Sequence, residues 1–140
     1  MAVTVSRSAC SGVRVVEFAS VLAGPYCGQL LADMGADVIK VESLTGDPLR
    51  ATLPEWCGLG AMFLHNNRGK RSICLDLQRP AGALAAARLI QGADVVIENF
   101  RPGVMERLGL SYETVAAENP SLVYASITGF GPSGPYAGLP

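Results

Sequence analysis

The sequence predicts an α/β fold in which a parallel β-sheet carries helices on both faces. Three observations support this prediction. Short apolar, β-branched runs alternate along the chain with longer segments of helical spacing. Two of the helical segments end at a glycine directly before the next apolar run. Two runs, residues 36–42 (ADVIKVE) and 93–98 (ADVVIE), repeat one pattern almost residue for residue.

The first part of the chain predicts one strand–helix–strand unit. After a frayed lead-in of residues 1–12, residues 13–18 (VRVVEF) have the composition of a buried strand. Residues 24–35 predict a helix, because Pro25 is tolerated in a first helical turn and the leucines that follow recur at helical spacing. Residues 36–42 predict the second strand, and the whole unit has the length of a βαβ motif.

The rest of the chain continues the alternation after a long connection. Residues 43–70 are rich in Gly, Pro and polar side chains, and a loop of this length implies a functional role or a short embedded helix. The remaining predicted elements are a strand over 72–77, a helix over 79–90, a strand over 93–98, a helix over 112–118 and a strand over 122–127.

A parallel sheet binds ligands at the carboxyl ends of its strands. The segments that leave the predicted strands are therefore the candidate functional segments: residues 19–24, 42–46, 77–79, 99–103 and 128–134.

Composition limits the class of protein. The 140 residues predict one domain, and 49% apolar against 16% charged residues is too apolar for a disordered segment. A net charge of −1 argues against a nucleic-acid binder that relies on bulk positive charge. No apolar run approaches the eighteen residues of a membrane span, and the first residues lack the apolar core of a signal peptide. The four cysteines have no paired spacing, which favours reduced thiols and a cytoplasmic protein over a disulfide framework or a zinc site.

Common nucleotide-binding motifs are missing from the sequence. It contains neither G-x-G-x-x-G nor the P-loop pattern. Ala23-Gly24 removes side-chain bulk, which serves either a ligand near the backbone or close helix–strand packing. The cationic segment 67–72 either holds phosphates or is a solvated loop. His65, the single histidine, is more typical of a loop or partly buried position than of a catalytic base, and nothing predicts a metal site.

Two further segments contain residue types suited to bind a ligand, and each directly follows a predicted strand. Residues 99–103 (NFRPG) follow a strand directly, so Phe100 is suited to stack on a base and Arg101 or Arg107 to neutralise phosphate. The alternative is that Phe100 belongs to the core and Pro-Gly is only a turn. Residues 128–136 (TGFGPSGPY) form either a substrate loop or a tail.

Several of these stretches together resemble the class III CoA-transferase family, which includes formyl-CoA transferase and the α-methylacyl-CoA racemases. The matching stretches extend in the family's order from residue 13 to residue 140: VRVVEFASVLAGPYCGQLLADMGADVIKVE, GDPLR, NRGKRSICLDL, ADVVIENFRPGVMERLGL and YASITGFGPSGPY. The resemblance implies a Rossmann-like domain over 13–140 that binds coenzyme A. It also implies that the chain is the N-terminal part, truncated at its C-terminal side, of a two-domain protein that forms interlocked homodimers.

The resemblance also implies which residues contact CoA, as a substrate and not as a tightly bound cofactor. They are Leu22, Ala23, Ser43, Leu75, Gln78, Asn99, Phe100, Arg101, Arg107, Thr128, Gly129, Phe130 and Gly131. Ser43 departs from the family, which often has arginine there. The phosphate or adenine clamp would then depend on Lys40, Arg71 or Arg79.

The family's nucleophile is an aspartate beyond the G-F-G-x-x-G-P-Y segment, so we expect it after Pro140 and predict no catalytic residue among these 140. The resemblance implies transfer of CoA from an acyl-CoA to a carboxylic acid through an aspartyl intermediate. The alternatives are an α-methylacyl-CoA racemase or epimerase and a non-catalytic CoA-binding domain. Asp47, Trp56 and Met62, in or near the 45–64 loop, are either acyl contacts or ordinary loop packing.

Overall fold

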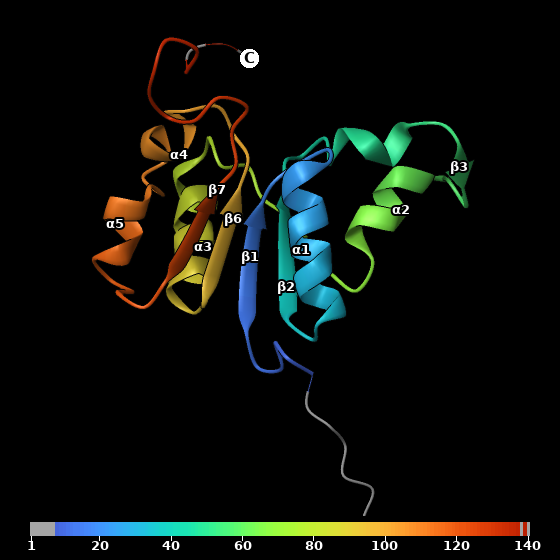
Figure 1. Cartoon of the computed structure of the whole chain (residues 1–140), viewed down its shortest axis with the longest axis horizontal. Coiled ribbons are helices and arrows are strands. Elements are labelled where there is room, and N and C mark those ends of the chain that lie inside the picture. The colour runs from blue at the N-terminus through green and yellow to red at the C-terminus, as the bar shows by residue number, and fades with distance from the viewer. Residues whose placement is uncertain (1–7, 138, 140) are drawn as a thin grey trace, which may run out of the picture.

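The structure is a computed structural model that describes residues 8–137 and residue 139. Most of the predicted lead-in, residues 1–7, lies outside the described residues. A five-stranded sheet forms the centre of the molecule (Figure 1). Its strands are β1 (Arg14–Phe18), β2 (Asp37–Glu42), β5 (Arg71–Cys74), β6 (Val95–Glu98) and β7 (Val123–Ser126). They lie in the order β5-β2-β1-β6-β7 and every neighbouring pair is parallel, which confirms the predicted parallel sheet.

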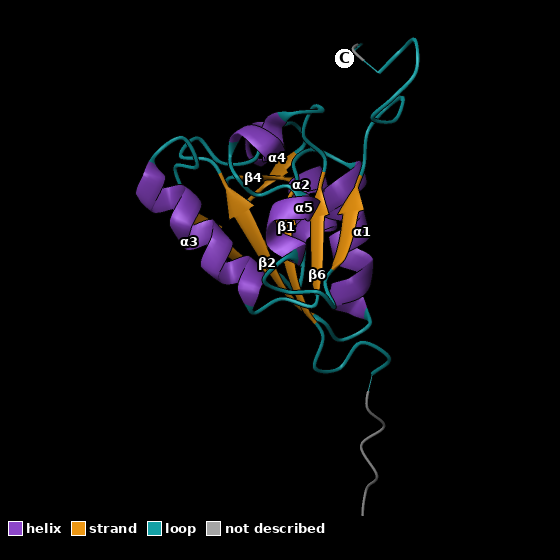
Figure 2. Cartoon of the chain, turned by 90° about the vertical axis from the view of Figure 1, so that its left-hand side faces the viewer, coloured by secondary structure: helices purple, strands orange, loops and turns teal. Residues whose placement is uncertain are grey.

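Helices cover both faces of the sheet, as predicted. Helix α1 (Ala23–Asp33) packs on one face, and α2 (Ala61–Asn67) packs against α1. Helix α3 (Pro80–Gln91) lies on the opposite face (Figure 2), with the short helices α4 (Val104–Arg107) and α5 (Tyr112–Ala116).

Two hydrophobic cores follow from the alternation of side chains along each strand. On β1, Val15 packs into the cluster on the α1 side, whereas Val16 and Phe18 pack into the larger cluster with α3. All three side chains are fully buried. Because both faces are covered, the central strands β1, β2 and β6 carry apolar residues on both sides, which made them recognisable in the sequence.

The predicted strand 72–77 is wrong at its end, because β5 stops at Cys74. Cys74 pairs with Glu42, the last residue of β2, so the ladder has no partner strand beyond that point. Leu75 and Leu77 continue the apolar pattern because they pack against the core on the α3 side.

The long connection of residues 43–70 holds the embedded helix that its length implied. A 3-10 helix over Pro48–Ala51 comes first, followed by a small antiparallel hairpin of β3 (Glu55–Trp56) and β4 (Leu59–Gly60) and then by α2. The hairpin and α4 were not predicted. Strands of two residues and a helix of four are too short to show a period in the sequence.

Within the part of the chain that the structure describes, no helix combines the length and the apolar character of a membrane span. All four cysteines are free.

Candidate ligand-binding edge

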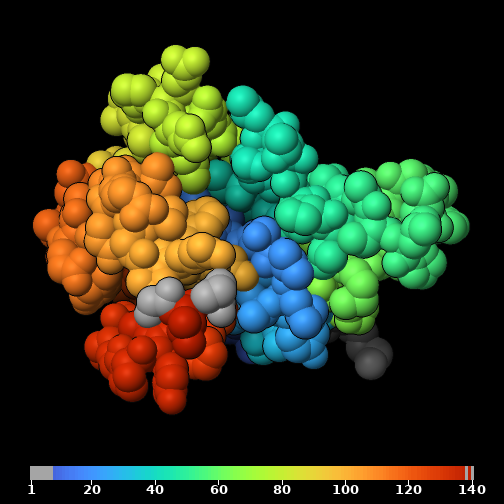
Figure 3. All heavy atoms as spheres, turned by 90° about the horizontal axis from the view of Figure 1, so that it is seen from above, coloured from blue at the N-terminus to red at the C-terminus, as the bar shows by residue number. Residues whose placement is uncertain are grey.

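The strand order places a topological switch point between β1 and β6. The chain leaves β1 towards β2 and later returns to β6 on the other side of β1. A crevice for ligands forms outside the carboxyl ends of the strands at such a point. Figure 3 looks down on this edge: the segment after β1 (blue) lies between those after β2 (teal) and β6 (orange).

Asn99 joins the two strands at the switch point. Its Oδ1 accepts a hydrogen bond from the Ser20 amide at 3.0 Å, and its Nδ2 donates to the Ser20 carbonyl at 2.8 Å. The side chain of Asn99 thus fixes the backbone of the neighbouring segment.

One hollow of about 370 Å³, which we call the β1–β6 hollow, lies beside Asn99. Gly131 donates from its amide to the Thr128 hydroxyl at 2.8 Å, which shapes the turn after β7 into one wall. The predicted contact residues that line it are Ala23, Asn99, Phe100, Arg101, Thr128, Gly129, Phe130 and Gly131.

A second hollow of about 440 Å³, the β2–β5 hollow, has Ser43, Leu75 and Gln78 in its lining, together with Phe100. A third, smaller one is lined by Phe100, by the last two residues of β2 and by residues that follow β1 and β2, Asp47 among them. Phe100 is therefore a shared wall of all three hollows, although it also packs against the α3-side core. The core interpretation of Phe100 is confirmed, and the stacking interpretation stays a prediction that the half-buried position of the ring allows.

Two predicted residues line none of these three hollows. Leu22 is exposed at the start of α1, and Arg107 is exposed on α4. Of the pair Ala23-Gly24, Ala23 lines the β1–β6 hollow, whereas Gly24 is buried where a Cβ would overlap the Ala19 side chain. Close helix–strand packing therefore explains Gly24, whereas a ligand near the backbone of Ala23 stays a prediction.

The structure corrects two of the three cations offered as a replacement for arginine at Ser43. Lys40 is buried with 1% of its side chain exposed, and its ammonium is fully engaged by protein groups. Arg71 binds Asp37 in a two-pronged ion pair at the start of β2, at the opposite end of the sheet. Only Arg79, exposed beside Asp76, belongs to the ligand-binding edge.

Sequence reasoning missed a chain of four buried charges beneath this edge, which we call the ion chain. Lys70 contacts Glu17 at 2.7 Å, Glu17 contacts Lys40 at 3.1 Å, and Lys40 contacts Asp47 at 3.0 Å. These side chains are 0–2% exposed, and the two positive and two negative charges balance. The alternation along VIKVE places Lys40 on the α1 side, but nothing local in the sequence shows that Glu17 lies across from it.

Asp47, suspected as an acyl contact, is a buried member of this ion chain and also accepts from the Leu49 amide at 2.9 Å. Trp56 is 71% exposed on the hairpin, and Met62 is exposed on α2. His65 is exposed on α2 and lines none of the hollows described above.

The carboxylate of Glu42, at the end of β2, is also held by hydrogen bonds. Arg50 donates to it from Nε at 2.8 Å and from a terminal nitrogen at 2.6 Å, and Ser72 and the Asp47 amide donate as well. The Arg50 hydrogen bonds are the main reason that the pKa of Glu42 falls to about 2. The Arg50 guanidinium in turn stacks over the Phe63 ring at 4.0 Å.

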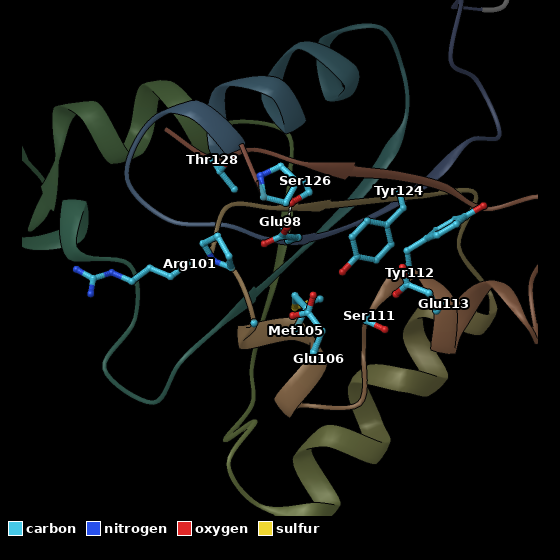
Figure 4. Close-up of a pocket in the computed structure, with 13 residues that line it drawn as sticks. Glu98, Arg101, Met105, Glu106, Ser111, Tyr112, Glu113, Tyr124, Ser126 and Thr128 are labelled. Carbon is cyan, nitrogen blue, oxygen red and sulfur yellow. Dashed lines mark hydrogen bonds between the residues drawn. The ribbon is translucent and has the colours of Figure 1, made fainter. Parts of the chain in front are cut away.

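An acidic hollow of about 330 Å³ lies beside Arg101 and Thr128 (Figure 4). Glu98, Glu106 and Glu113 line it, with Tyr112 and Tyr124. Burial and then the three carboxylates raise the pKa of Tyr124, whose hydroxyl donates to the Leu110 carbonyl at 3.1 Å. Buried Glu98 accepts from the Phe100 amide at 2.9 Å and from the Ser126 hydroxyl. Three carboxylates beside one arginine make this hollow less suited to phosphate than the β1–β6 hollow, whose lining has Arg101 and no carboxylate.

Fold and edge together define a class of protein: a doubly wound α/β domain that presents an aromatic wall and exposed arginines at its switch point. The comparisons give the family. The chain matches CoA-transferase family III over residues 10–140, and it belongs to this family.

Individual relatives agree with this assignment. The chain is 53% identical over 135 residues to a succinate–glutarate CoA-transferase of Agrobacterium fabrum, covering 91% of this chain and 34% of that protein. It is 45% identical over 132 residues to a probable fatty acyl-CoA transferase, Rv3272, of Mycobacterium tuberculosis, covering 92% of this chain and 34% of the relative. The chain thus spans about a third of the length of the curated relatives it matches.

A solved structure of a CAIB/BAIF family protein from Brucella suis superposes with a TM-score of 0.89 at 50% identity. That match covers 94% of this chain and 36% of the other. The similarity therefore extends over nearly all of the sheet and its helices.

Proposed function

We propose that this chain binds coenzyme A along the row of hollows at the carboxyl edge of its sheet. The observation that carries the proposal is Phe100, whose ring is shared by three hollows at the switch point. An extended ligand with an aromatic base and several phosphates fits such a row. The ring offers a stacking surface, and Arg101, in the wall of the β1–β6 hollow, offers a planar cation for phosphate. Ala23, Ser43, Leu75, Gln78, Asn99, Thr128, Gly129, Phe130 and Gly131 would complete the contacts, with Leu22 and Arg107 at the rim.

We further propose that the reaction served by this platform is CoA transfer from an acyl-CoA to a carboxylic acid. Family membership and the names of the relatives support transfer. A carboxylate nucleophile attacks the thioester carbon and releases the CoA thiolate, which leaves a mixed anhydride. The thiolate then attacks the enzyme's own carbonyl, which releases the first acid and gives an enzyme-CoA thioester. The acceptor acid repeats the two steps in reverse order.

The nucleophile of this proposal is an aspartate outside the described residues. At the ligand-binding edge, Glu42 and Asp47 are held by cations and backbone amides, and Glu98 is held by Ser126 and Phe100. A carboxylate engaged in this way is a weak nucleophile. We therefore expect these 140 residues to bind CoA without turning it over, and a homodimer of the longer protein to supply the rest of the site.

Calorimetric titration of the chain with CoA tests binding. The Phe100→Leu variant keeps an apolar anchor but removes the stacking surface, so we expect CoA binding to weaken about tenfold. Leu89→Met, a volume-conserving change of a partly buried residue on α3, is the matched control and should bind as the parent chain does. A folded parent chain that shows no heat of binding with CoA would contradict the proposal.

A further inference from the structure

The turn between β1 and α1 contains an unusual backbone conformation. Val21 has a φ of 68°, in the left-handed region that β-branched residues rarely adopt. It lies two residues before Ala23, which lines the β1–β6 hollow. Such a conformation persists only where the surroundings hold it, so the groups that contact this turn decide how the start of α1 faces the hollow.

Three side chains from three different segments hold this turn. Asn99 makes its two hydrogen bonds to the backbone of Ser20. Asp47 accepts from the Val21 amide through both carboxylate oxygens, at 3.3 and 3.4 Å. Asn66, fully buried on α2, reaches the Val21 carbonyl with its Nδ2 at 3.5 Å. Of these three side chains, only Asp47 is charged. It is also the only one of the three that accepts the hydrogen bond of the Val21 amide.

Asp47 is in turn held by the ion chain. Lys40 contacts Asp47 at 3.0 Å and also donates to the Ala19 carbonyl at 2.6 Å, one residue before the turn. Because these groups are excluded from water, removing one charge leaves another uncompensated, and the four charges behave as a unit. Hydrogen bonds to an ionised acceptor are stronger than those between neutral groups, which gives a reason for a carboxylate at this position.

We propose that Asp47 is a positioning residue for the CoA site: it fixes the Val21 turn and thereby the wall that Ala23 contributes to the β1–β6 hollow. This inference rests on the proposed function, because it assigns a role within that site. Asp47 borders the third, smaller hollow but is only 4% exposed, and its carboxylate is engaged by Lys40 and by backbone amides. Asp47 acts through the Val21 amide, and its carboxylate is held by the Leu49 amide as well as by Lys40.

A set of three variants separates positioning from stability. Asp47→Ala removes the acceptor and leaves a surplus positive charge in the ion chain. The double variant Asp47→Ala/Lys40→Met removes the acceptor but leaves the neutral Glu17–Lys70 pair. Lys40→Met alone leaves a surplus negative charge but keeps the acceptor for Val21, and it also controls for the loss of the Lys40 bond to Ala19. We therefore expect the double variant to have the highest melting temperature of the three.

The affinity for CoA, measured by calorimetry at neutral pH, should follow the presence of the Asp47 carboxylate and not the melting temperature. Both variants that lack the Asp47 carboxylate should bind about tenfold or more weakly than the parent chain. Lys40→Met should bind more tightly than the double variant, although it is less stable. Affinities that follow the melting temperatures would overturn the proposal, because Asp47 would then act only on stability.

Amide hydrogen exchange tests the same inference without ligand. The Val21 amide should exchange about tenfold faster or more in both variants that lack Asp47, and it should stay protected in Lys40→Met. Equal protection of Val21 in all three variants would overturn the positioning role. Failure of the parent chain to bind CoA would instead contradict the proposed function and leave the exchange result to decide the role of Asp47.

Discussion

The Glu42 carboxylate links the stability of the fold to pH. Its pKa lies near 2, against an ordinary value of 4.5, chiefly because Arg50 donates two hydrogen bonds to it. A depressed pKa in the folded state contributes stability that is complete above pH 4.5 and is lost as the pH falls towards 2. Since the side chain is buried, the contribution is on the order of 2–3 kcal/mol at neutral pH.

We therefore expect Glu42→Gln to lower the free energy of unfolding at pH 7 and to flatten its decline between pH 4.5 and 2. Urea unfolding at a series of pH values measures both effects. Glu55→Gln, on the exposed strand β3, is the control and should leave the curve unchanged. An unfolding free energy of Glu42→Gln that still falls as steeply on acidification would show that other carboxylates cause the acid sensitivity.

The family resemblance implies that Arg101 and Arg107 both contact CoA, but only Arg101 lines a hollow that Phe100 shares. Arg101 lines the β1–β6 hollow, whereas Arg107 is exposed on α4 and lines none of the three hollows that share Phe100. We expect Arg101→Ala to weaken CoA binding about tenfold and to reduce its salt dependence, because a charge-assisted phosphate contact is lost. Arg88→Ala, on the last turn of α3, is the matched control. An effect of Arg107→Ala larger than that of Arg101→Ala would mean that phosphate lies outside the hollow.

At the scale of elements, α1 approaches the sheet closely because two of its four buried residues are glycines. Gly28 packs against Glu17, and a Cβ there would overlap the carboxylate that holds both lysines of the ion chain. Gly28→Ala should therefore destabilise the fold by about 1–3 kcal/mol, although alanine is the better helix former. Thermal unfolding measures this, with Gly129→Ala as the control, since a Cβ there meets nothing within 4 Å. A stabilised Gly28→Ala variant would mean that helix propensity outweighs the overlap.

The strands and main helices were predictable because burial leaves short apolar runs where the strands lie and apolar residues at helical spacing where the helices lie. The ends of the elements were not predictable, since β5 stops where its neighbour β2 stops and not where its own apolar pattern does. The same limit applies to the site. Residues 99–103 were recognisable from their place after a strand, but Lys40 was not recognisable as buried, because its partners Glu17 and Asp47 belong to other segments.

At the scale of the whole molecule, α1 has an outer face that is apolar where a surface helix normally carries charge. Leu22, Tyr26, Leu30 and Met34 follow one another at intervals of four residues, and each is between 41% and 51% exposed. Asp33 is the single charged residue of the helix. Contiguous apolar surface of this kind promotes association between molecules.

The isolated chain should therefore associate through this face at micromolar concentrations. Sedimentation velocity over a concentration series should show species larger than a monomer, and replacing Tyr26 and Leu30 with glutamate should shift the distribution towards the monomer. Neither side chain belongs to either core and both are exposed, so the change should leave the melting temperature within about 2 °C per site. Replacing Leu53 and Trp56, the exposed apolar residues near the hairpin, provides the comparison. A single sharp monomer peak for the parent chain would contradict the prediction, and an equal response to the hairpin variant would locate the association away from α1.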